Sequence, residues 1–373
     1  MKFIHIAGTN GKGSVAEYIS EILMAAGKCC GCFTSPHLIS PVERFRVNGK
    51  NIAQTDLDAL MSEVAQKKLA VNDTLFAAYT AAALLWFDRC GVEYAVMETG
   101  LGGRLDPTNI VTPDVVVLTT IGYDHMDILG RSLEQITMEK CGIIKPDVPV
   151  VSAQQRIAAA RIITAQSKAA KAPLIFAKQI QVTAIDLDGQ TFRINDCEYH
   201  IKGIGKRQPE DAALAIMAAG QIGLCSQAIR EGLERTTLKC RAQYISGDPD
   251  MLIDGAHNSA SVDALCATMD KLFDDRQKIL LFACMNNKDY AVMTRKLAPH
   301  FTSVVVTNVD PVRGADALQL YHKFLAHTEC IVDNDPGKAY KKAREMAVQS
   351  SAMLVVCGSF YLAGKVYELT QKK

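Results

Sequence analysis

Residues 5–27, HIAGTNGKGSVAEYISEILMAAG, decide the fold because they join a β-rich apolar run, a glycine-rich loop and a helical pattern. A helix is expected because apolar residues recur at helical spacing and Gly27 supplies a stop. In the order strand, loop, helix, the loop N–H groups and the helix N-terminus face a common point that favours an anion. The apolar residues of the helical pattern are Val15, Ile19, Ile22, Leu23 and Ala26.

The loop departs from the general phosphate-loop pattern G-x-x-x-x-G-K-[ST]. Gly13 stands where Ser or Thr should follow Lys12, and the hydroxyl comes one residue later, at Ser14. Lys12 can place a positive charge on the β- and γ-phosphates of a nucleotide, and the glycines let the backbone approach closely. We expect the helix to begin at Ser14. A plain glycine-rich turn is the alternative.

Apolar runs alternate with helical patterns along the rest of the first half, for example VEYAVMETG (92–100) and PDVVVLTTIG (113–122). Nearly continuous apolar strands indicate a mostly parallel sheet covered on both faces, hence a doubly wound α/β domain. Residues 181–203 instead alternate around a DGQ turn, which predicts an appended antiparallel hairpin.

A second α/β series follows an aperiodic stretch at residues 234–250. Its strands are predicted in MLIDGAH, KILLFACM, SVVVTNV and AMLVVCGS. The length of 373 residues favours two domains. We therefore predict a P-loop domain over 1–239 and a smaller, Rossmann-like α/β domain over 240–373, with the ligand site in the cleft between them.

Composition excludes several classes of function. The chain has a net charge of +1, with 49% hydrophobic and 22% charged residues, so nothing predicts nucleic-acid binding. No apolar run reaches the length of a membrane span and the N-terminus lacks signal-peptide zones, so a cytoplasmic protein is expected. The 12 cysteines predict buried, reduced thiols. A zinc site at Cys29, Cys30 and Cys32 is a weak alternative, because no second half with ligand spacing exists.

Chemistry-bearing residues follow the ends of two further predicted strands, and another lies near a helix end. Glu98 ends an apolar run and could ligate Mg²⁺, which needs oxygen ligands, although a solvated carboxylate is the alternative. Asp124 and His125 end the next strand, where His125 is either functional or structural. Further on, Lys140 follows Glu139, and from local sequence alone this pair is interpreted as a surface ion pair.

The second series offers one polar turn, where Asp254 and Asn258 follow a strand. Asp254 could accept a hydrogen bond from a ribose hydroxyl, and N-capping of the next helix by Asp or Asn is an equal alternative. The NNKDY stretch lacks the residue between Lys288 and Asp289 that a guanine-reading N-K-x-D motif requires. Guanine specificity is therefore rejected.

Taken in order, these motifs resemble those of the folylpolyglutamate synthase and dihydrofolate synthase family of the Mur ligase superfamily. The match covers nearly the whole chain. It runs through GTNGKGS, TSPHL, ERFRVNG, ETGLGGRLDPTN, DHMDILG, EKCGIIKP, DGAHN, NKD and CGSFYL. The resemblance implies an ATP-dependent amide ligase that adds L-glutamate to a reduced folate, and possibly to dihydropteroate, through an acyl phosphate. We expect a monomer.

The resemblance assigns roles to particular residues. It implies two Mg²⁺ ions, held by Ser35, Glu98, His125 and a carbamylated Lys140, and it reverses the ion-pair interpretation of Lys140. The catalytic set is Lys12, His125 and Lys140. Folate-side contacts fall on Phe76, Asp106 and Thr108. The implied ATP contacts are Asn10, Gly11, Lys12, Gly13, Ser14, Asp211, Arg241, Asp254 and Asn258.

The chain departs from the family pattern at several positions. Ala77 stands where the family has Glu after Phe76, Asp211 replaces the Asn of Q-x-x-N-A, and Lys239-Cys240-Arg241 replaces P-G-R. Members also carry a few dozen residues before the P-loop strand, which begins here at Lys2. These departures leave a degenerate, non-catalytic nucleotide-binding homologue as one alternative. The other is a Mur-type ligase of a cell-wall precursor, which is expected to carry a different substrate-binding domain.

Overall fold

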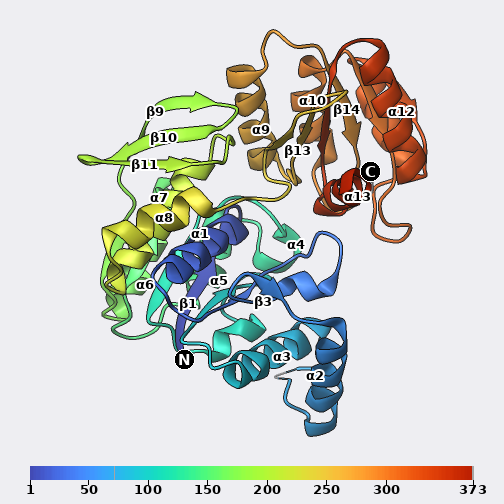
Figure 1. Ribbon diagram of the computed structural model, residues 1–373. Coiled ribbons are helices and arrows are strands. Elements are labelled where there is room, and N and C mark those ends of the chain that lie inside the picture. Colours follow the sequence, from blue (N-terminus) through green and yellow to red (C-terminus); the bar gives the residue numbers. More distant parts are fainter. Residues whose placement is uncertain (71, 372–373) are drawn as a thin grey trace. The chain divides into compact units, whose positions relative to one another are not determined.

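The computed structural model describes residues 1–70 and 72–371, which form two compact units (Figure 1). The N-terminal unit comprises Met1–Ala184, Gln190–Lys202 and Gln208–Thr237. The C-terminal unit comprises Ile185–Gly189, Gly203–Arg207 and Leu238–Lys373. Two short segments of the middle of the chain thus cluster with the C-terminal unit, a feature that the sequence did not predict. Among the described residues, no helix is both long and apolar enough to cross a membrane.

The N-terminal unit is built on an eight-stranded sheet of order β4-β3-β2-β5-β1-β6-β7-β8. The six strands from β2 to β8 in this order pair in parallel, and β3 and β4 form an antiparallel edge. The strands are β1 Lys2–Ala7, β2 Cys30–Phe33, β3 Phe45–Val47, β4 Lys50–Asn51, β5 Tyr94–Glu98, β6 Val115–Leu118, β7 Val150–Ser152 and β8 Leu174–Phe176.

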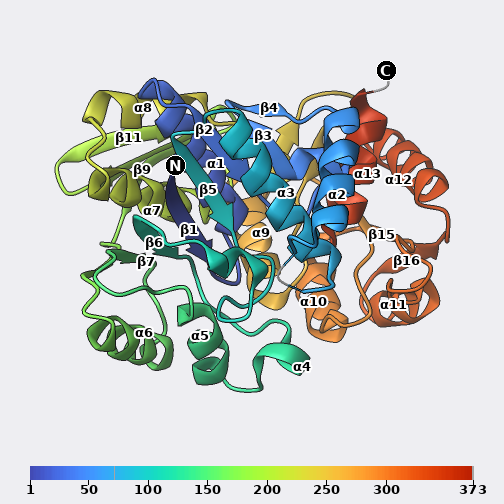
Figure 2. The same ribbon diagram turned by 90° about the horizontal axis from the view of Figure 1, so that it is seen from below.

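Helices cover both faces of this sheet, and its central strands are therefore buried on both sides. On one face α1 packs against α7 and α8. On the other face α2 and α3 pack beside β2 and β5, while α5 and α6 lie beside β6 and β7 (Figure 2). The helices are α1 Lys12–Ala25, α2 Gln54–Lys67, α3 Leu75–Arg89, α4 Met126–Leu129, α5 Leu133–Cys141, α6 Ile157–Ala169, α7 Gln208–Gln221 and α8 Ser226–Arg235, with short 3-10 turns at η1 Pro41–Arg44 and η2 Pro107–Ile110.

Residues 181–201 form a separate three-stranded sheet of order β11-β10-β9. The predicted hairpin is therefore incomplete, because the alternating pattern continues past a second turn and Cys197–Ile201 pairs antiparallel with Gly189–Ile194. The three strands are β9 Gln181–Asp186, β10 Gly189–Ile194 and β11 Cys197–Ile201.

The C-terminal unit has a six-stranded sheet of order β12-β13-β17-β14-β15-β16, parallel except for β12. One core joins this sheet to α9, α10 and α11, while α12 and α13 pack together on the opposite face. The elements are β12 Gln243–Ile245, β13 Met251–Ile253, α9 Ser259–Leu272, β14 Lys278–Phe282, α10 Tyr290–Leu297, η3 Ala298–His300, β15 Ser303–Val306, α11 Ala317–Leu325, β16 Glu329–Val332, α12 Pro336–Gln349, β17 Met353–Cys357 and α13 Phe360–Gln371.

Both units have the parallel-rich α/β architecture that the sequence predicts. Helix α1 begins at Lys12, however, two residues before the predicted start at Ser14. The difference has a physical cause, because Gly11 adopts a left-handed φ of 94° at the N-cap and turns the chain into the helix earlier. Lys12, Gly13 and Ser14 therefore form the first turn of α1, where helix N–H groups lack intrahelical partners.

Candidate active site

The predicted phosphate loop connects β1 to α1 at the carboxyl edge of the larger sheet. Gly11 cannot carry a side chain there, because a Cβ atom would lie 2.3 Å from Oδ1 of Asp211 on α7. The loop thus brings Asp211 against the backbone of Gly11, and the glycine N-cap supplies no side-chain acceptor for the first turn of α1. This leaves the helix N-terminus suited to an anion.

Glu98, Lys12 and Ser35 lie together beside this loop. Glu98 is only 2% exposed, so the alternative of a solvated carboxylate is wrong. Its Oε1 lies 3.8 Å from Nζ of Lys12, and its Oε2 accepts a hydrogen bond of 2.9 Å from the backbone N–H of Ser35. At this separation the two groups attract each other as charges but do not form a hydrogen bond.

Lys140 reaches the same loop from α5. It is buried, and its Nζ donates a hydrogen bond of 2.8 Å to the carbonyl oxygen of Gly8. Burial, together with the positive charge of Lys12, lowers the pKa of Lys140 to about 7. The surface ion pair inferred from local sequence is wrong, because Glu139 pairs with Arg104 at 2.9 Å on the outer side of the helix.

His125 lies on the loop between β6 and α4. It adopts a left-handed φ of 50° at the N-cap of α4, its backbone N–H donates to Oδ1 of Asp124 at 2.9 Å, and its Nε2 lies 3.9 Å from the same oxygen. The negative charge of Asp124 also raises the pKa of Lys140 against the larger effect of burial. Asp124 thus links His125 electrostatically to the phosphate loop.

Thr9 ties that loop to the phosphate loop, a role that the sequence analysis missed. Its backbone N–H donates to the carbonyl oxygen of Thr120 at 2.9 Å. Its hydroxyl donates to the carbonyl oxygen of Gly122 at 3.1 Å and accepts from the N–H of Gly122 at 3.1 Å. A threonine among loop glycines gives no signal of such a contact, because the partner loop lies more than one hundred residues away in sequence.

The three residues assigned to folate all contact the glycine-rich loop after β5. Asp106 and Thr108 are buried. Asp106 accepts from the N–H of Leu101 at 2.8 Å, from the N–H of Thr108 at 3.0 Å and from the Thr108 hydroxyl at 2.5 Å. The ring of Phe76 occupies the space that a Cβ at Gly100 would need, 2.6 Å away. In this structure the contacts of these three residues stabilise the conformation of the loop after β5.

His5 on β1 completes this arrangement, and the sequence analysis did not single it out. It is fully buried, and its Nε2 lies 2.8 Å from the hydroxyl oxygen of Thr108. Because that hydroxyl donates to Asp106, Nε2 of His5 must be the donor. Burial, with a contribution from Lys145, lowers the pKa of His5 to about 3, so the ring stays neutral.

In the C-terminal unit, the residues predicted to contact ATP form contacts within the protein. Asp254 is partly buried and accepts two hydrogen bonds of 2.6 Å, from the N–H groups of Ala242 and Ala256. Burial raises its pKa to about 6. Asn258 caps α9 through its side chain, so of the two capping candidates Asn258 is the cap and Asp254 is not. The guanidinium of Arg241 lies 5.0 Å from the ring centre of Phe360.

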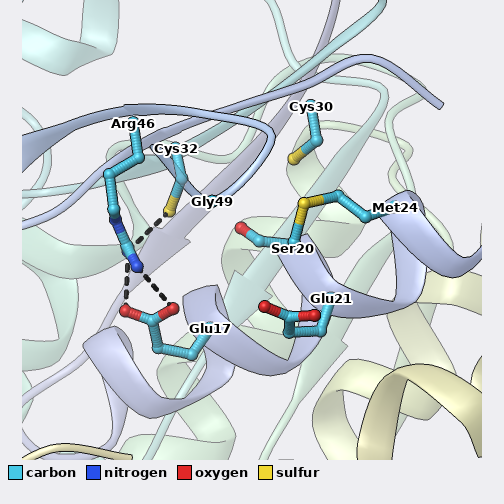
Figure 3. Close-up of a pocket in the computed structure, with 8 residues that line it drawn as sticks. All are labelled: Glu17, Ser20, Glu21, Met24, Cys30, Cys32, Arg46 and Gly49. Atoms are coloured by element: carbon cyan, nitrogen blue, oxygen red, sulfur yellow. Dashed lines mark hydrogen bonds and ion pairs between the residues drawn. The ribbon is translucent and has the colours of Figure 1, made fainter. Parts of the chain in front are cut away.

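A pocket lies apart from these residues, between α1 and the strands β2 and β3 (Figure 3). In this pocket the guanidinium of Arg46 donates to both carboxylate oxygens of Glu17, at 2.6 and 2.7 Å, and to Sγ of Cys32 at 3.3 Å. This fork fastens α1 to the strand that follows the Ser35 loop. The lining residues are Glu17, Ser20, Glu21, Met24, Cys30, Cys32, Arg46 and Gly49.

The cysteines are free throughout, and most are buried as predicted, although Cys90, Cys197 and Cys225 are exposed. Burial raises the pKa of Cys32 to about 11, so its thiol stays protonated. Within residues 1–70 and 72–371, no three His, Cys, Asp or Glu side chains are grouped to hold a metal ion. Magnesium, however, is commonly bound through one or two carboxylates with water and phosphate, and the buried oxygens of Glu98 fit that requirement.

Comparisons with known proteins agree with this geometry. The Mur ligase middle domain matches residues 6–219, and the Mur ligase glutamate ligase domain matches residues 240–360. The Bacillus subtilis dihydrofolate synthase/folylpolyglutamate synthase is 31% identical over 98% of this chain and 90% of its own length. The Escherichia coli protein of the same name is 30% identical over 98% and 85%.

Solved structures extend the match to three dimensions. A Mycobacterium tuberculosis folylpolyglutamate synthase complexed with ADP and AMPPCP superposes with a TM-score of 0.91 at 30% identity, covering 99% of this chain and 90% of that one. A bifunctional Yersinia pestis synthase complexed with AMPPNP and a Mn ion gives 0.87 at 26%, covering 99% and 89%. The predicted family and fold class are confirmed, and neither alternative function is favoured. The chain belongs to the Mur ligases and, among them, to the folylpolyglutamate synthase/dihydrofolate synthase family of ligases.

Proposed function

We propose that this chain uses ATP to join L-glutamate to the carboxylate of a reduced folate. The observation that carries the proposal is the grouping of Lys12, Glu98 and Lys140 around one phosphate loop. The cationic Lys12 beside the buried carboxylate of Glu98 suits a polyphosphate and a hard cation, whereas a purely structural loop gains little from burying a carboxylate and an amine beside it. Ligases of this class are expected to act as cytoplasmic monomers.

The chemistry follows from the leaving group. A carboxylate oxygen attacks the γ-phosphorus of ATP, ADP leaves, and an acyl phosphate forms. The amino group of L-glutamate then attacks the acyl carbon, phosphate leaves, and the nitrogen loses a proton to give the amide. The N-terminus of α1 and the ammonium of Lys12 stabilise the charge on the phosphoryl oxygens.

Glu98 and Ser35 are the proposed holders of the first Mg²⁺, and His125 with Lys140 would serve a second. When bound, such ions neutralise phosphate charge and orient the transferred group. Asp124 adds a carboxylate beside His125, so the donor set is rich in oxygen. These assignments rest on the family pattern together with the contacts of Glu98.

Lys140 is the proposed site of carbamylation. Its amine would add to the carbon of CO₂ and release a proton, which converts a cation into an anion. Only the neutral amine can react, and the pKa of about 7 leaves much of it neutral near neutral pH. An anion there would relieve the repulsion between Lys140 and Lys12.

Phe76, Asp106 and Thr108 are the proposed folate-side residues, and dihydropteroate is a second candidate acceptor. Asp106 and Thr108 use their polar atoms on the loop itself, so their contribution to binding would come through the shape of that loop. The proposed ATP contacts include Asp211 beside Gly11 and, from the C-terminal unit, Arg241, Asp254 and Asn258.

The test is an acceptor screen with purified protein, ATP, Mg²⁺, bicarbonate and L-glutamate. We expect glutamate-dependent ADP release with tetrahydrofolate, and product one glutamate heavier by mass spectrometry. Release only with a cell-wall precursor would overturn the folate assignment. No release with any acceptor, from a protein with an intact cooperative melting transition, would identify a non-catalytic homologue.

A further inference from the structure

The loop between β6 and α4 carries Asp124 and His125 and is held on one side by Thr9. Its other side faces the segment that follows β7. The regular ladder between β6 and β7 ends where the N–H of Ala153 donates to the carbonyl oxygen of Leu118 at 2.8 Å. Beyond this point the buried backbone groups of Thr119 and Ile121 need other partners.

The side chain of Gln155 provides hydrogen-bond partners for both backbone groups. Its Oε1 accepts from the N–H of Ile121 at 3.1 Å, and its Nε2 donates to the carbonyl oxygen of Thr119 at 3.0 Å. A third contact, from Nε2 to the hydroxyl of Ser152 at 3.3 Å, anchors the amide to β7. The side chain therefore continues the ladder beyond the end of the backbone pairing.

Only a carboxamide of this length fits that arrangement. The carbonyl of Thr119 needs a donor and the N–H of Ile121 needs an acceptor, so the orientation of the amide is fixed by its partners. Glutamate has the acceptor but no donor, asparagine is one methylene too short, and alanine has neither. Because Thr119 and Ile121 are buried, water has little access to the backbone groups that Gln155 binds.

We infer that Gln155 is a positioning residue for the second metal site, because it fixes the loop that carries Asp124 and His125. This inference rests on the proposed function, in which His125 serves that site. Thr9 and Gln155 hold the loop between the phosphate loop and β7. Outer partners of this kind orient ligands and commonly change metal affinity by about 10-fold to 100-fold when they are removed.

Gln154 provides a matched control. It is the preceding residue and also a glutamine, but it is exposed and donates to the carbonyl oxygen of Ala177, away from the loop. Gln154→Ala should therefore leave the loop unchanged. Gln155→Ala removes both contacts, and Gln155→Glu keeps the acceptor while it loses the donor.

The experiment measures Mn²⁺ binding to the full chain by electron paramagnetic resonance, with AMPPNP present so that no turnover occurs. In the wild type we expect two bound ions. In Gln155→Ala the second ion should bind about tenfold more weakly while the first is unchanged. Gln155→Glu should fall between, and Gln154→Ala should match the wild type. Unchanged binding of both ions by Gln155→Ala would overturn the inference.

Hydrogen exchange at the amide of Ile121 is the second measurement, and it does not depend on metal. Gln155→Ala should lose protection at this amide, and Gln154→Ala should retain it. If Gln155→Ala does not fold, Gln155→Glu is judged by the same two readouts. A wild type that binds no Mn²⁺ would contradict the proposed metal site, and unchanged protection of Ile121 in a folded Gln155 variant would overturn the role of Gln155.

Discussion

Each unit has polar side chains at a turn between a strand and a helix, but the two turns use these side chains differently. After β1, the glycine at the N-cap offers no side-chain acceptor, and the charged side chains of Lys12, Glu98 and Lys140 lie around the loop. After β13, both oxygens of Asp254 accept backbone hydrogen bonds and Asn258 caps α9. The first turn thus gathers charged side chains at a helix N-terminus that has no side-chain cap, whereas the second turn uses its polar side chains to bind the protein backbone.

The strongest test of this comparison is Lys12→Met. Loss of the ammonium that faces the phosphoryl group should lower kcat/KM for ligation about a thousandfold, the scale of a lost charge-stabilising donor. Steady-state kinetics measures the loss, and thermal melting should change little because Lys12 is partly exposed. Lys28→Met is the control, since Lys28 pairs with Glu93 on the surface. Wild-type turnover by Lys12→Met would refute the placement of the phosphate site.

The next largest effect is expected from Lys140, in the pH dependence of the free energy of unfolding. Its pKa of about 7 lies below its usual value, so the folded state loses the proton while the unfolded chain keeps it. Stability therefore rises from about pH 7 to about pH 9.5, by about 3 kcal/mol at 1.36 kcal/mol per pKa unit, and the gain is lost as pH falls. Thermal or denaturant unfolding in CO₂-free buffer measures it.

Lys140→Met should remove most of that slope, whereas Lys168→Met, at an exposed position on α6, should keep it. A slope that persists in Lys140→Met would show that the charge of Lys140 is compensated in the folded protein. The turn after β1 would then resemble the turn after β13, because the protein would compensate the polar groups of both.

Asp254→Ala tests the other side of the comparison. Removing the carboxylate leaves the N–H groups of Ala242 and Ala256 without their acceptor, which costs about 2 kcal/mol of stability. Urea unfolding should detect this loss, and Asp263→Ala on the exposed face of α9 should show much less. Unchanged stability of Asp254→Ala would mean that the carboxylate does not hold this turn, which would contradict the contrast.

Sequence predicted the elements that local pattern dictates. The strand, loop and helix at residues 2–25 and the alternation of strands and helices in both halves follow from apolar periodicity and glycine placement. The start of α1 was misplaced by two residues because the left-handed conformation of Gly11 depends on its packing against Asp211. The family motifs selected Glu98 and Lys140, yet their burial was not visible in the local sequence.

The contacts that hold the site together were beyond prediction for a different reason. Thr9, His5, Arg46 and Gln155 act through partners that are distant in sequence, and a polar residue in a loop gives no sign of which backbone group it will meet. The boundary between domains at residues 239 and 240 stays a prediction. So do the individual ligand roles, because they depend on molecules that bind the site rather than on the fold.

The smallest effect is expected at His5, which tests whether buried polar residues near the phosphate loop also serve the fold. His5→Phe loses the hydrogen bond to Thr108, about 1 kcal/mol, while His5→Gln keeps a donor near that position. Because burial lowers the folded pKa of His5 to about 3, the unfolded chain takes up the proton first. Wild-type stability therefore falls as pH drops from about 6.5, and both variants should lack this loss. Urea midpoints at about pH 7 and about pH 4.5 distinguish the two effects. A wild type and a His5→Phe variant with parallel pH profiles would mean that burial does not lower the pKa of His5, and at about pH 4.5 Thr108 would then be oriented by a charged imidazolium rather than by a neutral donor.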